Sequence, residues 1–341
     1  MHKWFENPAV DSSVVISSRV RLARNLRGYL FPPNLSFAQA QSLVGDLVRS
    51  IINERSLLNE HLTHTELSGL GHDELSRLSE RHLISSEMVN KTYRRGLISD
   101  NAENIAIMLN EEDHVRIQGI FCGDDIYGAY DIANRIDDLM SETLQFAFDP
   151  DFGYLTSCPT NTGTGLRASY MLHLPCMEYS GRLKKSADYI TKAGFAVRGI
   201  HGEGSQSMGN VYQVSNHFTL GMREDETIAA LKKLVAQLVE AENTLRQDFL
   251  QSWAAECEDR VHRAYGLLSR ARKIGLTEAM SLLSDLRSGK AMGIEPNAIT
   301  GITIYNAMIC VQPYSLCEIM GDTDDARELD INRAAFLRSL I

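Results

Sequence analysis

The chain has none of the cysteine spacings that mark a metal site or a disulfide framework. Its six cysteines include no C-x-x-C pair and no zinc-like spacing with histidine, so neither kind of site is expected. The first residues, MHKWFENPAVDSS, include no apolar signal region, and the longest apolar stretches are shorter than a membrane span. Secretion and membrane insertion are therefore not expected, and a reducing cytoplasm fits best.

Positive charge is also in short supply. The sequence has 34 Lys and Arg against 44 Asp and Glu, a formal net charge of −10. Nucleic acids and anionic membranes bind proteins with a positive field, so neither is expected as a partner. Hydrophobic residues make up 44% and charged residues 23%, which is typical of a folded globular chain.

The common nucleotide-binding motifs are absent or incomplete. No Walker A motif occurs, and GTGLRA at 163–168 matches the dinucleotide pattern without a regular βαβ context. DFG at 151–153 is not accompanied by the other motifs of eukaryotic-type kinases. If the chain binds ATP, it uses another set of residues.

Strand and helix patterns alternate irregularly along the first two thirds of the chain. Period-two patterns predict strands at 14–22, at two places within 104–121, and at 151–157, 193–200 and 211–221. Helical patterns are predicted at 36–58 and 124–146, and LRASYMLHL is predicted as a helix after the glycine-rich loop CPTNTGTG. The absence of regular βαβ units predicts an α+β fold with a mainly antiparallel sheet flanked by helices.

The pattern changes after Asp225, where long helical periodicity begins and strand signals almost end. We therefore predict two domains, a mixed domain at 1–250 and a helical domain at 251–341. The apolar run GITIYNAMIC at 301–310 fits a dimer face or an ordinary core equally well.

Five arginines lie in or beside polar, glycine-rich segments or on a polar strand face. They are Arg19, Arg21, Arg116, Arg167 and Arg198. Each planar guanidinium can hold phosphate oxygens through paired hydrogen bonds, so several in one cleft would bind a triphosphate without a P-loop. Any one of them alone is better explained as a surface arginine.

Two glutamates and a cysteine suit a positively charged phosphate acceptor. A guanidinium has almost no free lone pair, so its attack on phosphorus needs carboxylates that orient it and take its proton. Glu112 in NEEDH and Glu203 in HGEGS are the candidates. Cys158 precedes the predicted helix, whose dipole would favour a thiolate beside such a cation. Solvated glutamates and a small buried cysteine are the commoner interpretations of single residues of these types.

Four segments occur in the order of the signature blocks of the phosphagen (guanidino) kinases, and over residues 14–250 the chain resembles that family. The segments are SSRVRLARN, NEEDHVRI, YLTSCPTNTGTGLRAS and VRGIHGEGS. The early first block and the helical C-terminal extension resemble the bacterial protein-arginine kinases of the McsB type. The resemblance implies a glutamine-synthetase-like catalytic fold, ATP with Mg²⁺ as donor, and arginines of other proteins as acceptors. It also implies that the modified proteins are marked for a Clp protease in a stress response.

The resemblance further implies roles for single residues. The phosphate-binding arginines of the family match Arg19, Arg21, Arg116, Arg167 and Arg198, and an adenine-side histidine matches His82. Glu112 matches the catalytic glutamate, Glu203 the second guanidinium-holding glutamate, and Cys158 the active-site cysteine. Magnesium is expected to be held through ATP and water, without a protein ligand.

One C-terminal segment departs from the family pattern. McsB-type kinases read phosphoarginine through an R-D-x-x-R-A motif, and here Leu329 replaces the first arginine while Asp330 and Arg333 remain. We predict an allosteric phosphoarginine site at Asp330 and Arg333, or a helix with solvated charges. A homodimer, an activator protein and a Clp ATPase are the implied partners.

Two other functions remain open from the sequence. One is a kinase for free arginine or another small guanidino compound, against which the early first block argues. The other is a non-catalytic adaptor that binds phosphoarginine, against which the complete set of catalytic candidates argues.

Overall fold

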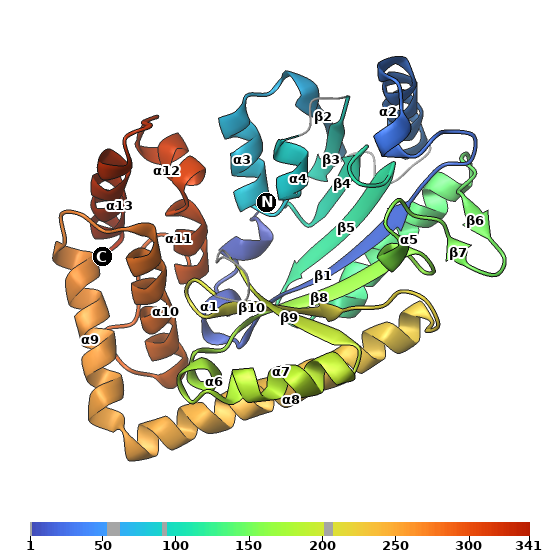
Figure 1. Cartoon of the computed structure of the whole chain (residues 1–341). Helices are drawn as coiled ribbons and strands as arrows, with labels where there is room; N and C mark the ends of the chain where they lie inside the picture. The colour runs from blue at the N-terminus through green and yellow to red at the C-terminus, as the bar shows by residue number, and fades with distance from the viewer. Residues whose placement is uncertain (1, 53–61, 91–93, 201–206) are drawn as a thin grey trace.

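The computed structural model describes residues 2–52, 62–90, 94–200 and 207–341. In these ranges a large sheet lies between layers of helices, and further helices stand together at one end (Figure 1). The strands are β1 (Val15–Arg24), β2 (Leu62–Glu66), β3 (Gly96–Asp100), β4 (Ile105–Leu109), β5 (Val115–Cys122), β6 (Phe148–Asp149), β7 (Gly153–Tyr154), β8 (Leu166–His173), β9 (Phe195–Gly199) and β10 (Val211–Asn216). The helices are α1 (Ala9–Ser12), α2 (Phe37–Ile51), α3 (His72–Glu80), α4 (Ser86–Val89), α5 (Ile126–Ser141), α6 (Pro175–Tyr179), α7 (Arg182–Lys192), α8 (Glu224–Ser252), α9 (Ala254–Arg270), α10 (Leu276–Met292), α11 (Ile304–Cys310), α12 (Pro313–Met320) and α13 (Ala326–Leu340).

Among the described residues, eight strands form one sheet in the order β2-β3-β4-β5-β1-β8-β10-β9. Every neighbouring pair in that order is antiparallel. The predicted antiparallel α+β fold is thus confirmed. The loop-rich segment 151–157 contains only the two-residue strand β7, which pairs with β6 outside the large sheet.

The prediction of a helix for LRASYMLHL was wrong, because this segment is the central strand β8. Its side chains alternate between the polar Arg167 and Ser169 on one face and the apolar Ala168, Tyr170 and Leu172 on the other. Pairing with β1 and β10 satisfies its backbone on both sides. Pairing with the two neighbouring strands therefore made this segment a strand, although its apolar content suits a helix equally well.

The apolar face of the sheet forms the main core with α5 and α8. On β1 this face carries Val20 and Leu22, both fully buried, and they join a cluster that includes Ile136 of α5 and Leu231 of α8. In Figure 1 the long helix α8 runs along the lower side of the sheet. Burial of each such side chain contributes about 1.5–3 kcal/mol to the stability of the fold. The apolar face therefore holds in place the strands whose other face carries the polar side chains.

The opposite, polar face is covered only toward its edges. Helices α3 and α4 pack on Met108 and Leu97 at the β3–β4 side. The C-terminal helices pack on Ile120 and Met171 at one end of β5 and β8. The middle of this face, on β1, β5 and β8, therefore remains available for polar side chains.

The C-terminal helices share a core with the N-terminal segment. Trp4, Phe5 and Val10 are buried in the same cluster as residues of α9, α10, α11 and α13. Asp11 accepts hydrogen bonds from the backbone N–H groups of Ile304 and Tyr305 at 2.9 and 3.1 Å. In the part of the chain that the structure describes, no helix is both long and apolar enough to cross a bilayer.

Candidate active site

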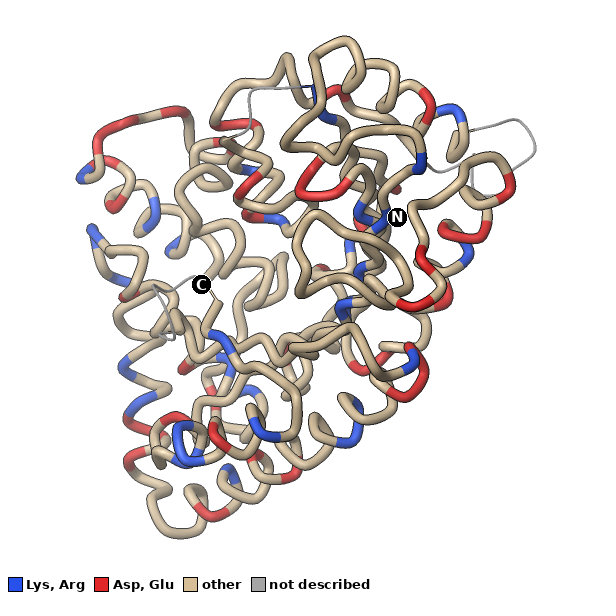
Figure 2. Tube along the Cα trace, turned by 45° about the vertical axis from the view of Figure 1, so that its right-hand side comes forward, with Lys and Arg blue, Asp and Glu red and all other residues tan. Residues whose placement is uncertain are grey.

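The strand register brings all five predicted arginines to one face of the sheet. Residues directly opposite each other in an antiparallel pair share a face. Arg21 of β1 lies opposite Arg167 of β8 and Gln118 of β5, which also carries Arg116 two residues away. Gln213 of β10 lies opposite both Met171 of β8 and Arg198 of β9, so Arg198 faces the same side as Arg167. In Figure 2 several Lys and Arg positions lie close together beside the N-terminal label, while other basic and acidic positions are spread over the molecule.

Of these five arginines, Arg19, Arg21 and Arg167 have no ion pair with a carboxylate among the described residues, whereas Arg116 does. Arg19 donates to Ser169 Oγ at 3.4 Å and to Gln213 Oε1 at 2.5 Å, which are both neutral acceptors. The Nε atoms of Arg21 and Arg167 are buried and have no hydrogen-bond partner. Buried donors without acceptors are costly in a folded protein, so this cluster fits an anion with several oxygens.

Burial and then mutual repulsion lower the pKa values of Arg19, Arg21 and Arg167. Burial and then the charge of Arg167 lower the pKa of Arg19 to about 10. Burial, followed by Arg19, Arg116 and Arg167, lowers the pKa of Arg21 well below its usual value. The pKa of Arg167 is lowered by burial and by Arg198. A bound polyanion would remove this repulsion, because opposite charge favours the charged form of each arginine.

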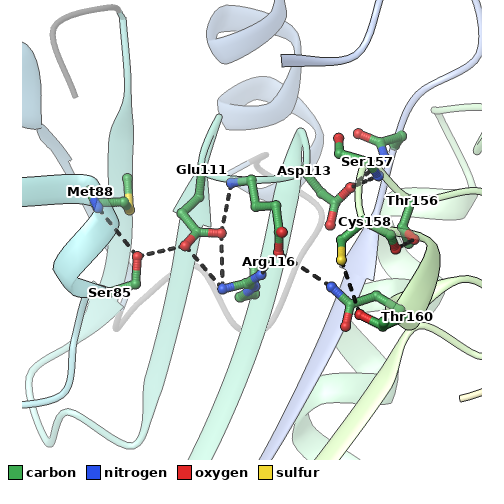
Figure 3. Close-up of polar contacts among 12 residues, drawn as sticks. Ser85, Met88, Glu111, Asp113, Arg116, Thr156, Ser157, Cys158 and Thr160 are labelled. Carbon is green, nitrogen blue, oxygen red and sulfur yellow. Dashed lines mark hydrogen bonds and ion pairs between the residues drawn. The ribbon is translucent and has the colours of Figure 1, made fainter. Parts of the chain in front are cut away.

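The hairpin between β4 and β5 holds two glutamates against Arg116. Arg116 Nη2 lies 2.8 Å from Glu112 Oε2, and its Nη1 lies 2.9 Å from Glu111 Oε2. Glu111 is fully buried and accepts a hydrogen bond from Ser85 Oγ at 2.5 Å (Figure 3). Glu112 is partly exposed and also lies 3.3 Å from Asn161 Nδ2. Glu111 therefore holds Arg116 from a buried position, whereas Glu112 holds it from the partly exposed wall of the cavity described below.

The next residue of the hairpin fixes the loop that carries Cys158. Asp113 Oδ1 accepts hydrogen bonds from Asn25 Nδ2 and from the backbone N–H of Ser157, both at 2.7 Å. Cys158 Sγ lies 3.0 Å from Thr160 Oγ1, and Figure 3 shows both beside the hairpin. Only a three-residue 3-10 helix, Pro159–Asn161, follows Cys158. The dipole argument for its thiolate was therefore wrong, since β8 replaces the expected helix.

A cavity of about 260 Å³ unites most of these groups. It is lined by Arg21, Arg116, Arg167, Glu112, Cys158, Glu87, Thr160, Asn161, Ala23 and Gly165. Gly165 has φ +64°, and a Cβ there would lie 2.6 Å from the carbonyl oxygen of Ala23, so a side chain would strain this wall of the cavity. Cations, a carboxylate and a thiol thus meet in one space of the size of a small substrate group.

The remaining predicted residues lie at different distances from this cavity. Arg19 is on the same face but next to Gln213, and Arg198 is exposed on the outer strand β9. The carbonyl oxygen of His82 accepts a hydrogen bond from Gln118 Nε2 at 2.8 Å, which places His82 above the arginine face. Glu203 lies outside the described residues.

The predicted C-terminal pair has a different environment. Arg333 is buried and donates to the carbonyl oxygens of Val311 and Ile274 at 3.0 and 3.1 Å and to Asp330 at 2.7 Å. Its guanidinium thus joins three segments of the helical region. Its predicted role in phosphoarginine binding stays a prediction.

Sequence reasoning missed Glu111, Asp113 and Ser85. Glu111 and Asp113 stand on either side of Glu112, but their partners Ser85, Asn25 and Ser157 are distant in sequence. The available signal was the pair of adjacent glutamates shortly before Arg116, because two neighbouring carboxylates can both pair with one guanidinium.

Comparison with family models divides the chain between two domains. Residues 44–245 match the C-terminal catalytic domain of ATP:guanido phosphotransferases, and residues 254–341 match the C-terminal domain of protein-arginine kinase McsB. The first match contains most strands of the sheet, and the second contains helices α9 to α13.

Similar proteins along the full length include three curated protein-arginine kinases. That of Clostridium kluyveri is 38% identical over 341 residues, which cover 99% of this chain and 98% of that protein. That of Bacillus subtilis is 38% identical over 349 residues, with 99% and 93% covered. That of Desulforamulus reducens is 41% identical over 339 residues, with 98% and 94% covered.

Two solved structures share the fold. Lombricine kinase is 24% identical with a TM-score of 0.59, covering 69% of this chain and 67% of that one. The duplicated taurocyamine kinase from Schistosoma mansoni, with bound transition state analog components, is 22% identical with a TM-score of 0.61, covering 91% and 47%.

Proposed function

The chain belongs to the ATP:guanido phosphotransferase family, in the branch that carries the McsB C-terminal domain, and from that premise we propose that it phosphorylates arginine side chains of other proteins. The observation that carries the proposal is the position of Glu112 in the wall of a cavity that also contains Arg21 and Arg167, two arginines without an ion-pair partner among the described residues. Such a cavity suits a triphosphate on one side and a guanidinium on the other.

The donor is MgATP, and its phosphates bind the arginine face. Arg21, Arg116 and Arg167 hold the transferring phosphate in the cavity, and Arg19, Arg198 and His82 bind farther along the nucleotide. Fixed guanidinium groups stabilise the charge that develops on the transferring group, which is the main requirement in phosphoryl transfer. No group of three or more acidic, histidine or cysteine side chains suited to a metal occurs among the described residues, so Mg²⁺ would arrive with the ATP.

The acceptor is held by carboxylates. Glu112 binds the substrate guanidinium and directs one nitrogen at the γ-phosphorus, with Glu203 as its predicted partner. The nitrogen–phosphorus bond forms as the bond from the γ-phosphorus to the β–γ bridging oxygen breaks, and ADP leaves. The nitrogen gives its proton to one of these carboxylates, which passes it to water. Cys158 supports the acceptor cation from the loop side.

The choice of acceptor is tested by offering free arginine and an unfolded basic protein side by side, with labelled ATP. Label on the protein in excess of label on free arginine supports the proposal. Label on free arginine alone would establish the small-guanidino kinase instead.

Downstream of this reaction we propose that the modified proteins pass to a Clp ATPase and its protease under stress. The proposal also includes a cytoplasmic homodimer and an activator protein, and its support is the likeness of residues 254–341 to the McsB C-terminal domain. Degradation assays with phosphorylated and unphosphorylated substrate test it, and equal rates for both would reject it.

A further inference from the structure

A second, larger hollow lies outside the catalytic cavity. It has a volume of about 660 Å³ and lies between the β6–β7 hairpin and the segment that leads into α8. Figure 1 shows this hairpin and the start of α8 at the same edge of the molecule, on the right. We call it the acidic groove, and the residues used below are Asp151, Phe152, Leu220, Met222, Asp225 and Glu226.

Apolar side chains in the acidic groove are unusually exposed. Phe152 and Leu220 are each 56% exposed and Met222 is 49% exposed. They come from two segments that are about 70 residues apart in sequence, so the fold has brought them together. Clusters of exposed large apolar residues with a polar rim are typical of protein interaction sites.

The rim of the acidic groove is mainly negative. Asp151, Glu224, Asp225 and Glu226 contribute four carboxylates, against one guanidinium from Arg223. Arg223 is paired with Asp225 at 3.2 Å, and Glu224 accepts a hydrogen bond from Tyr130. Glu226 accepts a hydrogen bond from the backbone N–H of Arg223 at 3.0 Å, but neither it nor Asp151 has an ion pair with a basic side chain among the described residues. The negative charges of Asp151 and Glu226 therefore remain to attract a cationic partner, and complementary charge favours such a partner over an acidic one.

A single loop separates the acidic groove from the catalytic cavity. Gly163 and Thr164 line the groove, whereas Asn161 and Gly165 of the same loop line the cavity. Thr219 fixes this loop, because its Oγ1 donates to the carbonyl oxygen of Thr162 at 2.7 Å and its carbonyl oxygen accepts from Thr164 N at 3.0 Å. A polypeptide bound in the acidic groove would therefore lie on the other side of this loop from the catalytic cavity.

We propose that the acidic groove binds an unfolded, basic segment of the protein substrate, next to the arginine that enters the catalytic cavity. This inference rests on the proposed function, and it adds that the acidic groove selects which proteins are phosphorylated. Apolar side chains of the segment pack on Phe152, Leu220 and Met222, and its Lys or Arg residues meet Asp151 and Glu226. A folded substrate would present such residues together less often than an unfolded one.

The test compares two matched double variants of the full chain. The groove variant is Asp151→Lys with Leu220→Ser, and the control is Asp188→Lys with Tyr189→Ser on α7, which lies outside both hollows. All four positions are exposed. Binding of a fluorescent, unfolded, arginine-rich polypeptide is measured at fixed salt, together with KM for that polypeptide and for ATP.

The groove variant is expected to bind the polypeptide about tenfold more weakly and to raise its KM by a similar factor. Its KM for ATP and its melting temperature stay at the wild-type values, and the control behaves as wild type. If the groove variant binds the polypeptide as tightly as the wild type does, and the wild type phosphorylates that polypeptide, the proposed role of the groove is wrong and the proposed function stands. Altered self-association with unchanged polypeptide binding would also overturn it, in favour of a second copy of the chain. Failure of the wild type to phosphorylate any protein would overturn the proposed function and the groove with it.

Discussion

Arg21 of β1 lies directly opposite Arg167 of β8, so two guanidinium side chains start from neighbouring positions on one face of the sheet. Like charges directly opposite each other on paired strands are destabilising. Both Nε atoms are buried and have no hydrogen-bond partner among the residues that the structure describes. The fold therefore carries an electrostatic cost at its centre that a bound polyanion relieves.

Replacement of Arg21 by Met is expected to stabilise the protein in the absence of nucleotide. Burial, and after it the charge of Arg19, lowers the pKa of Arg21, which means that the charged form of this side chain is less stable in the folded protein than in the unfolded chain. Removal of the charge should raise the free energy of unfolding by about 1 kcal/mol. ATP should stabilise the wild type by binding its folded state, and it should stabilise the variant less, because one of the proposed phosphate-binding arginines is missing.

Chemical denaturation with and without MgATP measures both effects. Arg27→Met is the matched control, since Arg27 is exposed just beyond β1, and it should alter neither quantity. A less stable Arg21→Met protein that ATP stabilises as much as it stabilises the wild type would contradict the role of Arg21.

Glu112→Gln is expected to lower kcat by a factor of about 10² to 10⁴, the usual contribution of a positioned acid or base. The amide keeps the shape of the side chain but neither attracts a guanidinium nor takes its proton. ATP binding should persist, because the arginines are unchanged. Glu87→Gln is the control, since Glu87 lines the same cavity and is exposed. Steady-state kinetics and nucleotide binding measure these effects, and normal turnover by Glu112→Gln would refute the assignment.

The rate should fall on the acid side at a higher pH than an ordinary glutamate predicts. Burial raises the pKa of Glu112, Arg116 lowers it, and Asp113 and Glu111 raise it again, with a net shift upward from 4.5. A raised carboxyl pKa means that the active carboxylate is present only above that pKa and is lost as the pH falls through it. A pH profile of kcat/KM should therefore have its acid limb above pH 4.5. An acid limb at or below that value would contradict the burial of Glu112.

Arg333→Ala should destabilise the helical region by about 2–4 kcal/mol, because it leaves the buried carbonyl oxygens of Val311 and Ile274 without their donor. Arg327→Ala, at an exposed position of α13, should change stability by less than about 0.5 kcal/mol. Thermal melting of both variants measures the difference. Equal stability of the two would show that the hydrogen bonds of Arg333 are not needed for folding.

Much of the candidate site follows from local sequence patterns. The period-two alternation in VVISSRVRL places Arg19 and Arg21 on one face, and the structure confirms that strand as β1. The acidic turn between two strands is also confirmed as the hairpin at 110–114. Both are local features, so neighbouring residues were sufficient to predict them.

The rest of the site depends on contacts between distant segments. Residues 166–173 form a strand because they pair with β1 and β10, and the composition of this segment alone does not predict that pairing. The anchoring role of Glu111 depends on Ser85, and the position of the Cys158 loop depends on Asp113. The acidic groove is likewise formed by two segments that meet only after folding. The proposed boundary between 1–250 and 251–341 stays a prediction.

The most direct test is mass spectrometry of an unfolded, basic protein after incubation with MgATP and either the wild-type chain or Glu112→Gln. The expected result with the wild type is phosphate on arginine nitrogen, removed by mild acid, and none with the variant. Phosphate that is stable to acid and located on serine, threonine or tyrosine, or no phosphate at all, would contradict the assignment of this cavity to guanidinium phosphorylation.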